Sequence, residues 1–249
     1  MSSATYTIWL RNLKRYIRSK SRIFGSLGQP LFFLVVLGFG LSSLNIPGAT
    51  GGYLKFIIPG IIAMTVLFTS IFSGIQIIWD KQFGFLKETL VAPISRLSIM
   101  LGQTFGGATT ALIQGLLIMI LAFVIGGIFP SAMGLIIALV FMVLIGLAFT
   151  SLGIAIASKM EDMQGFQLIM NFVIFPIFLL SGALFPLTDA PKALKIITYF
   201  DPMTYGVEGM RYGILGSSSI NPLICFLVLG GFAALMILIG SILFKKIKV

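Results

Sequence analysis

Long apolar runs separated by short polar segments dominate the chain. A helix needs about twenty apolar residues to cross roughly 30 Å of hydrocarbon, and six runs reach that length. Their predicted bounds are 23–43, 54–79, 98–126, 131–158, 164–184 and 221–244. No fixed-period repeat and no long polar linker separates them. The pattern therefore predicts an all-α membrane protein with six transmembrane helices, and residues 1–249 as one domain.

An amphipathic segment, residues 1–22, precedes the first run. Apolar residues recur there at three- and four-residue spacing, which places Tyr6, Trp9, Leu10, Leu13 and Ile17 on one helical face. Basic side chains project elsewhere, at Arg11, Lys14, Arg15 and Arg18. We expect a helix in the membrane interface near anionic lipid, either as a simple anchor or as a docking element. No small-residue cleavage site follows, so the first run is expected to remain as an uncleaved anchor.

The segment between the second and third runs, "DKQFGFLKETLVAPISR" (80–96), does not resemble an ordinary loop. It holds five of the 24 charged residues, with apolar side chains between them at Phe83, Phe85, Leu86 and Leu90. A loop that is simply exposed to water does not require these aromatic and aliphatic side chains. The pattern favours a helix between the two membrane spans.

The segment before the last run, about 185–220, is also unusual. Pro186, Pro191, Pro202 and Pro222 divide it. Two apolar-rich stretches lie between the prolines, 192–200 and 204–215, and each is too short to span a membrane. We predict two short helices in the outer membrane interface.

Composition and charge agree with a membrane protein. Hydrophobic residues make up 58% of the chain and charged residues only 10%, against about 25% charged in average soluble domains. The net charge of +10 would suggest a nucleic-acid partner in a soluble protein. Here 13 of the 17 basic residues fall in the N-terminal segment, the loops after the second and fourth runs, and the C-terminal tail. This bias predicts cytoplasmic termini in a cell (plasma or inner) membrane, with no nucleic-acid partner.

No residue pattern points to catalysis. The chain has no histidine, one cysteine and no G-x-x-x-x-G-K-[ST] phosphate loop, and its seven acidic residues fall in loops or at run ends by the bounds above. We therefore expect no catalytic, cofactor or metal site. An intramembrane enzyme is disfavoured, and so is a carrier driven by protons or sodium, although sodium sites built from carbonyl groups stay possible.

Small and polar residues inside the runs predict helix packing. Gly102 and Gly106 are four residues apart, and Gly107, Ala111 and Gly115 repeat that spacing, which lets helix backbones approach closely. Gly146 and Gly153 do so in the fourth run. For the polar residues Gln114 and Asn171, hydrogen bonds between helices and contacts with a substrate are both open.

Four segments together resemble the signature segments of ABC-2-type permeases. They are "YLKFIIPGIIAM" (53–64), "LKETLVAPISR" (86–96), "LSGALFPL" (180–187) and "FDPMTYGVEGMRYGIL" (200–215). The likeness extends over essentially the whole chain and is strongest to small exporters of the daunorubicin-resistance and multidrug type. It implies a membrane subunit that pairs with a second permease copy, normally as a homodimer, and with two copies of a separately encoded ATP-binding cassette. ATP and magnesium would bind to that partner, and this chain would not be an enzyme.

The resemblance also implies roles for particular residues. The segment 81–93 corresponds to a coupling helix that rests on the cassette, flanked by the N-terminal helix. Its candidate contacts are Phe83, Phe85, Leu86, Glu88 and Leu90. Pro93 would end the helix, Ser95 would cap the next one, and Arg96 would mark the return to the membrane.

The substrate path of the family runs along the dimer axis, lined by the second and fifth spans. Candidate residues on these spans are Thr65, Phe68, Thr69, Phe72, Asn171, Phe172 and Phe175. Aromatic faces with few polar groups suit an amphipathic or lipid-like cargo. We therefore expect an exporter of a drug-like or lipid-like compound. The alternatives are export of a lipid-linked polysaccharide and a membrane scaffold without cargo.

Overall fold

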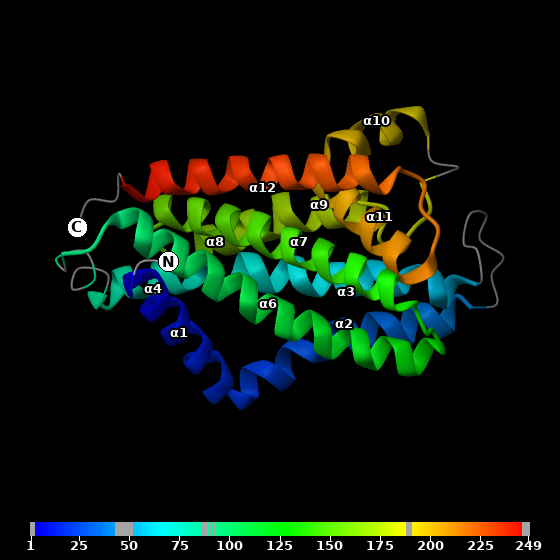
Figure 1. Cartoon of the computed structure of the whole chain (residues 1–249), viewed down its shortest axis with the longest axis horizontal. Helices are drawn as coiled ribbons and strands as arrows, with labels where there is room; N and C mark the ends of the chain where they lie inside the picture. Colours follow the sequence, from blue (N-terminus) through cyan, green and yellow to red (C-terminus); the bar gives the residue numbers. More distant parts are fainter. Residues whose placement is uncertain are drawn as a thin grey trace.

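The computed structural model describes residues 3–42, 52–85, 89, 91, 93–187 and 191–245, without the side chain of residue 22. All regular structure in these ranges is helical. The long helices run side by side along one axis, and both chain termini lie at the same end of the molecule (Figure 1). We call this end, which also holds α4, the terminal end, and the opposite one, which holds α10, the α10 end.

The helices in chain order are α1 (Ser3–Arg18), α2 (Lys20–Gly40), α3 (Tyr53–Phe72), α4 (Ile75–Gln82), α6 (Arg96–Gly126), α7 (Ala132–Lys159), α8 (Met163–Ile169), the π-helical turn η1 (Met170–Ile174), α9 (Phe175–Leu180), α10 (Lys192–Phe200), α11 (Pro202–Leu215) and α12 (Pro222–Lys245). Six segments are long and apolar enough to cross a membrane: Ile23–Gly40, Tyr53–Gln82, Arg96–Gly126, Ala132–Lys159, Met163–Leu180 and Pro222–Lys245. The prediction of an all-α membrane protein with six spans is confirmed.

Short polar residues begin several of these helices. Ser95 Oγ accepts a hydrogen bond from Ser98 N, and Asp162 Oδ1 accepts one from Gly165 N, at 3.1 and 2.6 Å. Each satisfies a backbone donor that has no partner inside its helix. The predicted cap at Ser95 is therefore present, and Arg96 is the first residue of α6.

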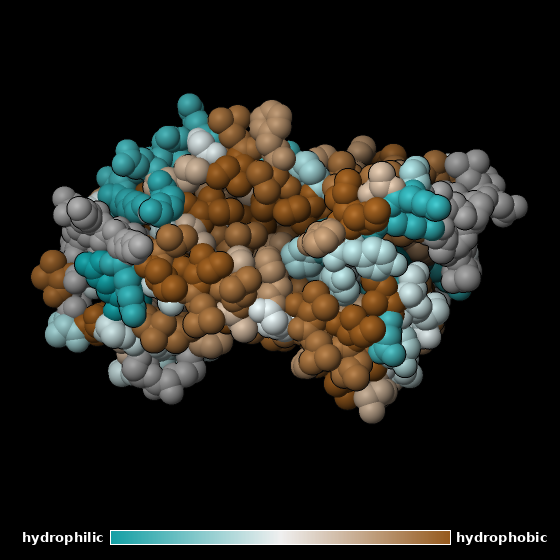
Figure 2. Space-filling view, turned by 90° about the horizontal axis from the view of Figure 1, so that it is seen from above, coloured by the Kyte–Doolittle hydropathy of each residue, from teal (hydrophilic) through white to brown (hydrophobic). Residues whose placement is uncertain are grey.

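Helix α3 is the centre of the bundle. Its span is 78% buried, whereas the spans containing α2 and α8–α9 are 17% and 22% buried. Helices α2, α6, α7 and α11 all pack against α3. On the side of α12, apolar residues cover most of the middle of the molecule and hydrophilic residues gather toward its two ends (Figure 2). The exposed apolar surface therefore forms a band suited to lipid.

The second span is two helices rather than the continuous one predicted for 54–79. Gly74 N donates to Ile71 O, three residues earlier, and α3 gives way to α4 at this point. The break coincides with a close approach of α7, where a Cβ added to Gly153 would lie 2.6 Å from Ile71 O. Two backbones can meet this closely only because both contact residues, Gly74 and Gly153, lack side chains.

The fifth span is also interrupted. The π-helical turn Met170–Ile174 separates α8 from α9, directly before Phe175 and Pro176. Proline supplies no backbone N–H to the helix, and π-turns within α-helices often mark functional sites. The candidate path residues Asn171 and Phe172 lie on this turn.

Helix α11 does not lie on the surface as predicted for 204–215. Most of its residues are buried, and it packs against α3, α7 and α12. Glycines allow this insertion: a Cβ added to Gly213 would lie 2.7 Å from Ala138 N of α7. By contrast, α10 exposes large apolar side chains such as Phe200.

The α3–α7 contact yields a stability prediction. Gly153→Ala should lower the free energy of unfolding by roughly 1–3 kcal/mol, because the added methyl meets backbone atoms that must shift. Thermal unfolding of the purified chain in detergent measures the effect. Gly231→Ala is the matched control, because nothing lies within 4 Å of its added Cβ, and it should be neutral or slightly stabilising. Equal unfolding temperatures for the two variants would contradict the assigned contact.

Candidate functional site

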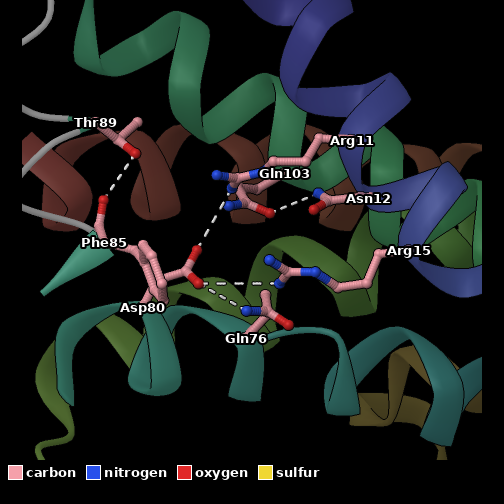
Figure 3. Close-up of polar contacts among 8 residues, drawn as sticks. All are labelled: Arg11, Asn12, Arg15, Gln76, Asp80, Phe85, Thr89 and Gln103. Carbon is pink, nitrogen blue, oxygen red and sulfur yellow. Dashed lines mark hydrogen bonds and ion pairs between the residues drawn. The ribbon is translucent and has the colours of Figure 1, made fainter. Parts of the chain in front are cut away.

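Asp80 joins α4 to α1 at the terminal end (Figure 3). The residue is only 3% exposed. Its Oδ2 accepts from Arg11 Nη2 at 3.4 Å, and its Oδ1 accepts from Gln76 Nε2 at 2.7 Å. Arg15 Nη1 lies 3.9 Å from Oδ1. A buried carboxylate is stable only with such partners, so the site holds α1 and α4 in a fixed relation.

Lys81 joins α4 to α7. Its Nζ donates to three backbone carbonyls at the end of α7: Ser158 O at 2.7 Å, Met160 O at 3.1 Å and Ala157 O at 3.2 Å. The last carbonyls of a helix lack the usual i+4 partner, and Ala157 O also accepts from Met160 N at 3.2 Å. A cation at this end complements the helix dipole. Neighbouring residues 80 and 81 therefore connect α4 to two different helices.

Helix α1 packs along the first half of α6 through polar contacts. Four side-chain hydrogen bonds join the two helices: Thr5 Oγ1 to Ser98 O (3.3 Å), Trp9 Nε1 to Thr109 Oγ1 (3.0 Å), Asn12 Nδ2 to Gln103 Oε1 (2.6 Å), and Tyr16 Oη to Gln114 Oε1. Of the predicted apolar face, Tyr6 and Ile17 are instead more than half exposed. Gln114 thus makes a hydrogen bond between helices, one of the two roles left open above.

The helix predicted for 81–93 is wrong at its start. Lys81 and Gln82 belong to α4, and Gly84 follows with a φ of +80°, which interrupts the helix. Glycine adopts this left-handed conformation without steric cost. Beyond it, Thr89 Oγ1 donates to Phe85 O at 3.0 Å, a spacing of one helical turn.

Three of the predicted contact residues in this segment, Leu86, Glu88 and Leu90, lie outside the described residues. Phe83 is 70% exposed and Phe85 53% exposed, and Pro93 is exposed too. Arg96 Nη1 donates to Lys245 O and so links the start of α6 to the end of α12. Phe83 and Phe85 therefore present exposed rings next to α4, which Asp80 and Lys81 connect to α1 and α7.

The predicted path residues divide into four groups. The Phe68 ring lies tilted against that of Phe175 and edge-on to that of Phe178, with ring centroids 6.4 and 5.9 Å apart, so the second and fifth spans do meet. Thr65 is buried and bonds its own helix at Ile61 O. Thr69 and Phe72 line a cavity of about 480 Å³, and Asn171 and Phe172 are exposed on the fifth span.

A second buried charge cluster lies on α11, and the sequence reasoning missed it. Glu208 and Arg211 are both buried and form an ion pair. Arg211 Nη2 donates to Gly182 O at 2.8 Å, and its guanidinium lies 4.2 Å from the Phe56 ring centroid. Ser219 N donates to Glu208 Oε2. The available signal was an E-x-x-R spacing in a glycine-rich helix, a pattern that exposed helices also carry.

Asp201, the N-cap of α11, has an altered pKa. Its Oδ1 accepts from Met203 N at 2.8 Å. Burial raises the pKa of this carboxyl to about 7, because the surroundings disfavour the charged form more than the two hydrogen bonds favour it. The start of α11 therefore changes charge near neutral pH.

Comparison with known proteins decides the family. A family model described as ABC-2 type transporter matches residues 3–215, which run from α1 to the end of α11. The chain belongs to the ABC-2 type transporter family. No group of three or more potential metal ligands from histidine, cysteine, aspartate and glutamate occurs in the described ranges.

Individual relatives cover most of the chain. The Cyanophora paradoxa protein ycf38, whose name describes a transport permease, is 30% identical over 88% of this chain and 80% of its own length. Nodulation protein J of Rhizobium leguminosarum bv. viciae is 27% identical over 96% and 93%. The Mycobacterium tuberculosis (strain ATCC 25618 / H37Rv) protein DrrC, whose name describes a doxorubicin resistance ABC transporter permease, is 25% identical over 88% and 79%.

The α11 cluster can be tested by a double-mutant cycle. Glu208→Gln or Arg211→Met alone should destabilise the chain by about 3–5 kcal/mol, because each leaves the other charge buried and unpaired. The double variant should lose less than the sum of the two, by at least ~1 kcal/mol. Unfolding in detergent gives the three values. Glu161→Gln, at an exposed position, should change little, and additive losses at 208 and 211 would contradict the pairing.

Proposed function

We propose that this chain is the permease subunit of an ATP-binding-cassette exporter driven by a separately encoded ATPase. The family match over residues 3–215 is the observation that carries the proposal. The sequence has no phosphate-binding loop, so ATP and magnesium would bind to the partner. DrrC, with its drug-resistance name, supports an amphipathic or hydrophobic compound as cargo.

In this proposal the ATPase docks at the terminal end, on the segment that follows α4. Exposed aromatic rings such as Phe83 and Phe85 suit a pocket on a partner, as interface anchors do. Leu86, Glu88 and Leu90 are further candidate contacts. Asp80 and Lys81 give the segment a rigid base, because they fix α4 to α1 and α7. Movement of the partner would therefore reach three helices together.

The complex would contain two permease copies and two ATPases in a cell membrane, with the terminal end in the cytoplasm. The bias of basic residues toward that end supports this orientation. Asn171 and Phe172, exposed on the π-turn of the fifth span, would face a path between the two copies. The cargo would leave the cytoplasm or the inner leaflet along that path.

Co-purification tests the central claim. The tagged chain is isolated in mild detergent from the cells that encode it, with ATP, with a non-hydrolysable analogue or without nucleotide. A P-loop ATPase that lacks membrane spans should co-purify in equal amount. If no such ATPase associates under any of the three conditions, the proposal fails.

The coupling role predicts a specific defect. In the assembled complex reconstituted in vesicles, Phe83→Ala should weaken ATPase binding at most modestly, because other contacts remain, while transport per ATP hydrolysed falls about tenfold, because one contact that passes on the movement of the ATPase is lost. Phe129→Ala is the control, since Phe129 is 91% exposed and follows α6 at the opposite end. Unchanged transport by the Phe83 variant would exclude this residue from coupling.

A further inference from the structure

A cavity of about 480 Å³ lies beside the α1–α2 junction, within the size range of ligand pockets. Its lining comes from α1, α2, α3, α4 and α8. Phe72, Ile75, Trp79 and Met163 give it an apolar wall, and Trp79 Nε1 lies 3.0 Å from Met163 Sδ, which closes the wall between α4 and α8. The cavity can therefore accept a hydrocarbon chain or ring system.

Among the residues that the structure describes, Arg15 is the one charged member of this lining. The two oxygens of Asp80 are already engaged, by Gln76 at 2.7 Å and by Arg11 at 3.4 Å, whereas Arg15 stays at 3.9 Å, beyond hydrogen-bond distance. The structure gives Arg15 no hydrogen bond to a described residue. A guanidinium has five N–H donors in a planar fork that matches carboxylate and phosphate, so Arg15 can bind such a group.

The same residue also lines an open groove of about 530 Å³ on the exposed side of α1. The other charged residues of this groove are Arg11, Lys14 and Arg18, and all are basic. Exposed apolar side chains of the adjoining segments, Ile17 and Phe24, suit lipid rather than a water-soluble partner. Arg15 thus connects a basic surface groove with an apolar cavity.

We infer that this cavity binds an amphiphile with a single anionic group, a carboxylate or a phosphate. Arg15 holds the anionic group, and the apolar part lies against Phe72, Ile75 and Trp79. Lys14 and Arg18 attract such molecules to the groove. Naming the amphiphile as cargo rests on the proposed function, whereas the binding site does not.

Other occupants fit the lining less well. A small hydrophilic anion would leave the apolar wall in contact with water. A cationic amphiphile would place its charge beside Arg15, and no acidic residue appears in the described lining. The nearby carboxylate of Asp80 is buried and already accepts from Gln76 and Arg11. The cation of Arg15 therefore selects an anionic group on the ligand, and the apolar wall selects a hydrocarbon part.

Trp79 provides a direct reporter for a binding experiment. The chain has two tryptophans, and Trp9→Phe leaves Trp79 as the only one. The permease alone, in a zwitterionic detergent, is titrated with brominated stearic acid or with brominated stearylamine, whose bromines quench tryptophan on contact. The acid should reach half-maximal quenching at a concentration about tenfold lower than the amine. Equal curves for the two probes would overturn the inference.

Variants separate the cavity from the Asp80 site. Arg15→Gln should weaken quenching by the acid about tenfold and abolish the preference over the amine, whereas Arg15→Lys should keep that preference because the charge remains. Arg11→Gln removes an Asp80 partner that lines the groove but not the cavity, so it should lose less acid affinity than Arg15→Gln. An equal loss in the Arg15→Gln and Arg11→Gln variants would contradict the assignment.

Two further arms identify the source of the ligand. Millimolar inorganic phosphate should not displace the brominated acid, and displacement would reduce the site to a simple anion site and overturn the inference. Brominated phosphatidylglycerol should quench less than the single-chain acid. Stronger quenching by this phospholipid would overturn the assignment to cargo. All arms omit the ATPase, so their failure is distinct from a failed co-purification.

Discussion

The contact between the backbones of α3 and α7 at Gly74 and Gly153 determines much of the architecture. It coincides with the break that ends α3, after which α4 begins at Ile75. Asp80 and Lys81 stand on α4, so the break sets where both can find partners on α1 and α7. The cavity beside Arg15 is lined from both sides of the same break, by Phe72 and Ile75.

Buried charge follows a single rule at the two ends of the molecule. Asp80 at the terminal end and Glu208 on α11 are almost fully buried, and each accepts hydrogen bonds from more than one segment. Burying an unpaired charge costs several kcal/mol, so these residues require their neighbours to be in place. Apolar contacts alone do not fix the register of one helix against the next, since lipid is as apolar as a leucine side chain. The two charge clusters therefore fix that register.

The six spans could be predicted because length and hydropathy alone identify them. The interruptions at Ser73–Gly74 and before Pro176 could not be predicted. The first depends on packing against α7 and the second on a widened helical turn, and apolar composition reveals neither. The face that α1 turns to α6 was missed for a related reason. In a membrane the apolar face of a helix can meet lipid while a mixed face, here Thr5, Asn12 and Tyr16, bonds to protein. The Glu208–Arg211 pair could not be predicted, because the E-x-x-R spacing does not tell whether the short helix that carries it is buried.

The Arg15 cavity and the aromatic residues of the second and fifth spans follow one another along the molecule. Phe68 is one helical turn from Phe72 on α3, so the ring cluster of Phe68, Phe175 and Phe178 lies next to the cavity toward the α10 end. A ligand that moved from the cavity along these two spans would meet this ring cluster. Phe175 begins α9 directly after the π-turn, and π-turns within α-helices are rare and occur frequently at functional sites. The interruption of the fifth span thus lies beside the rings through which the second and fifth spans meet.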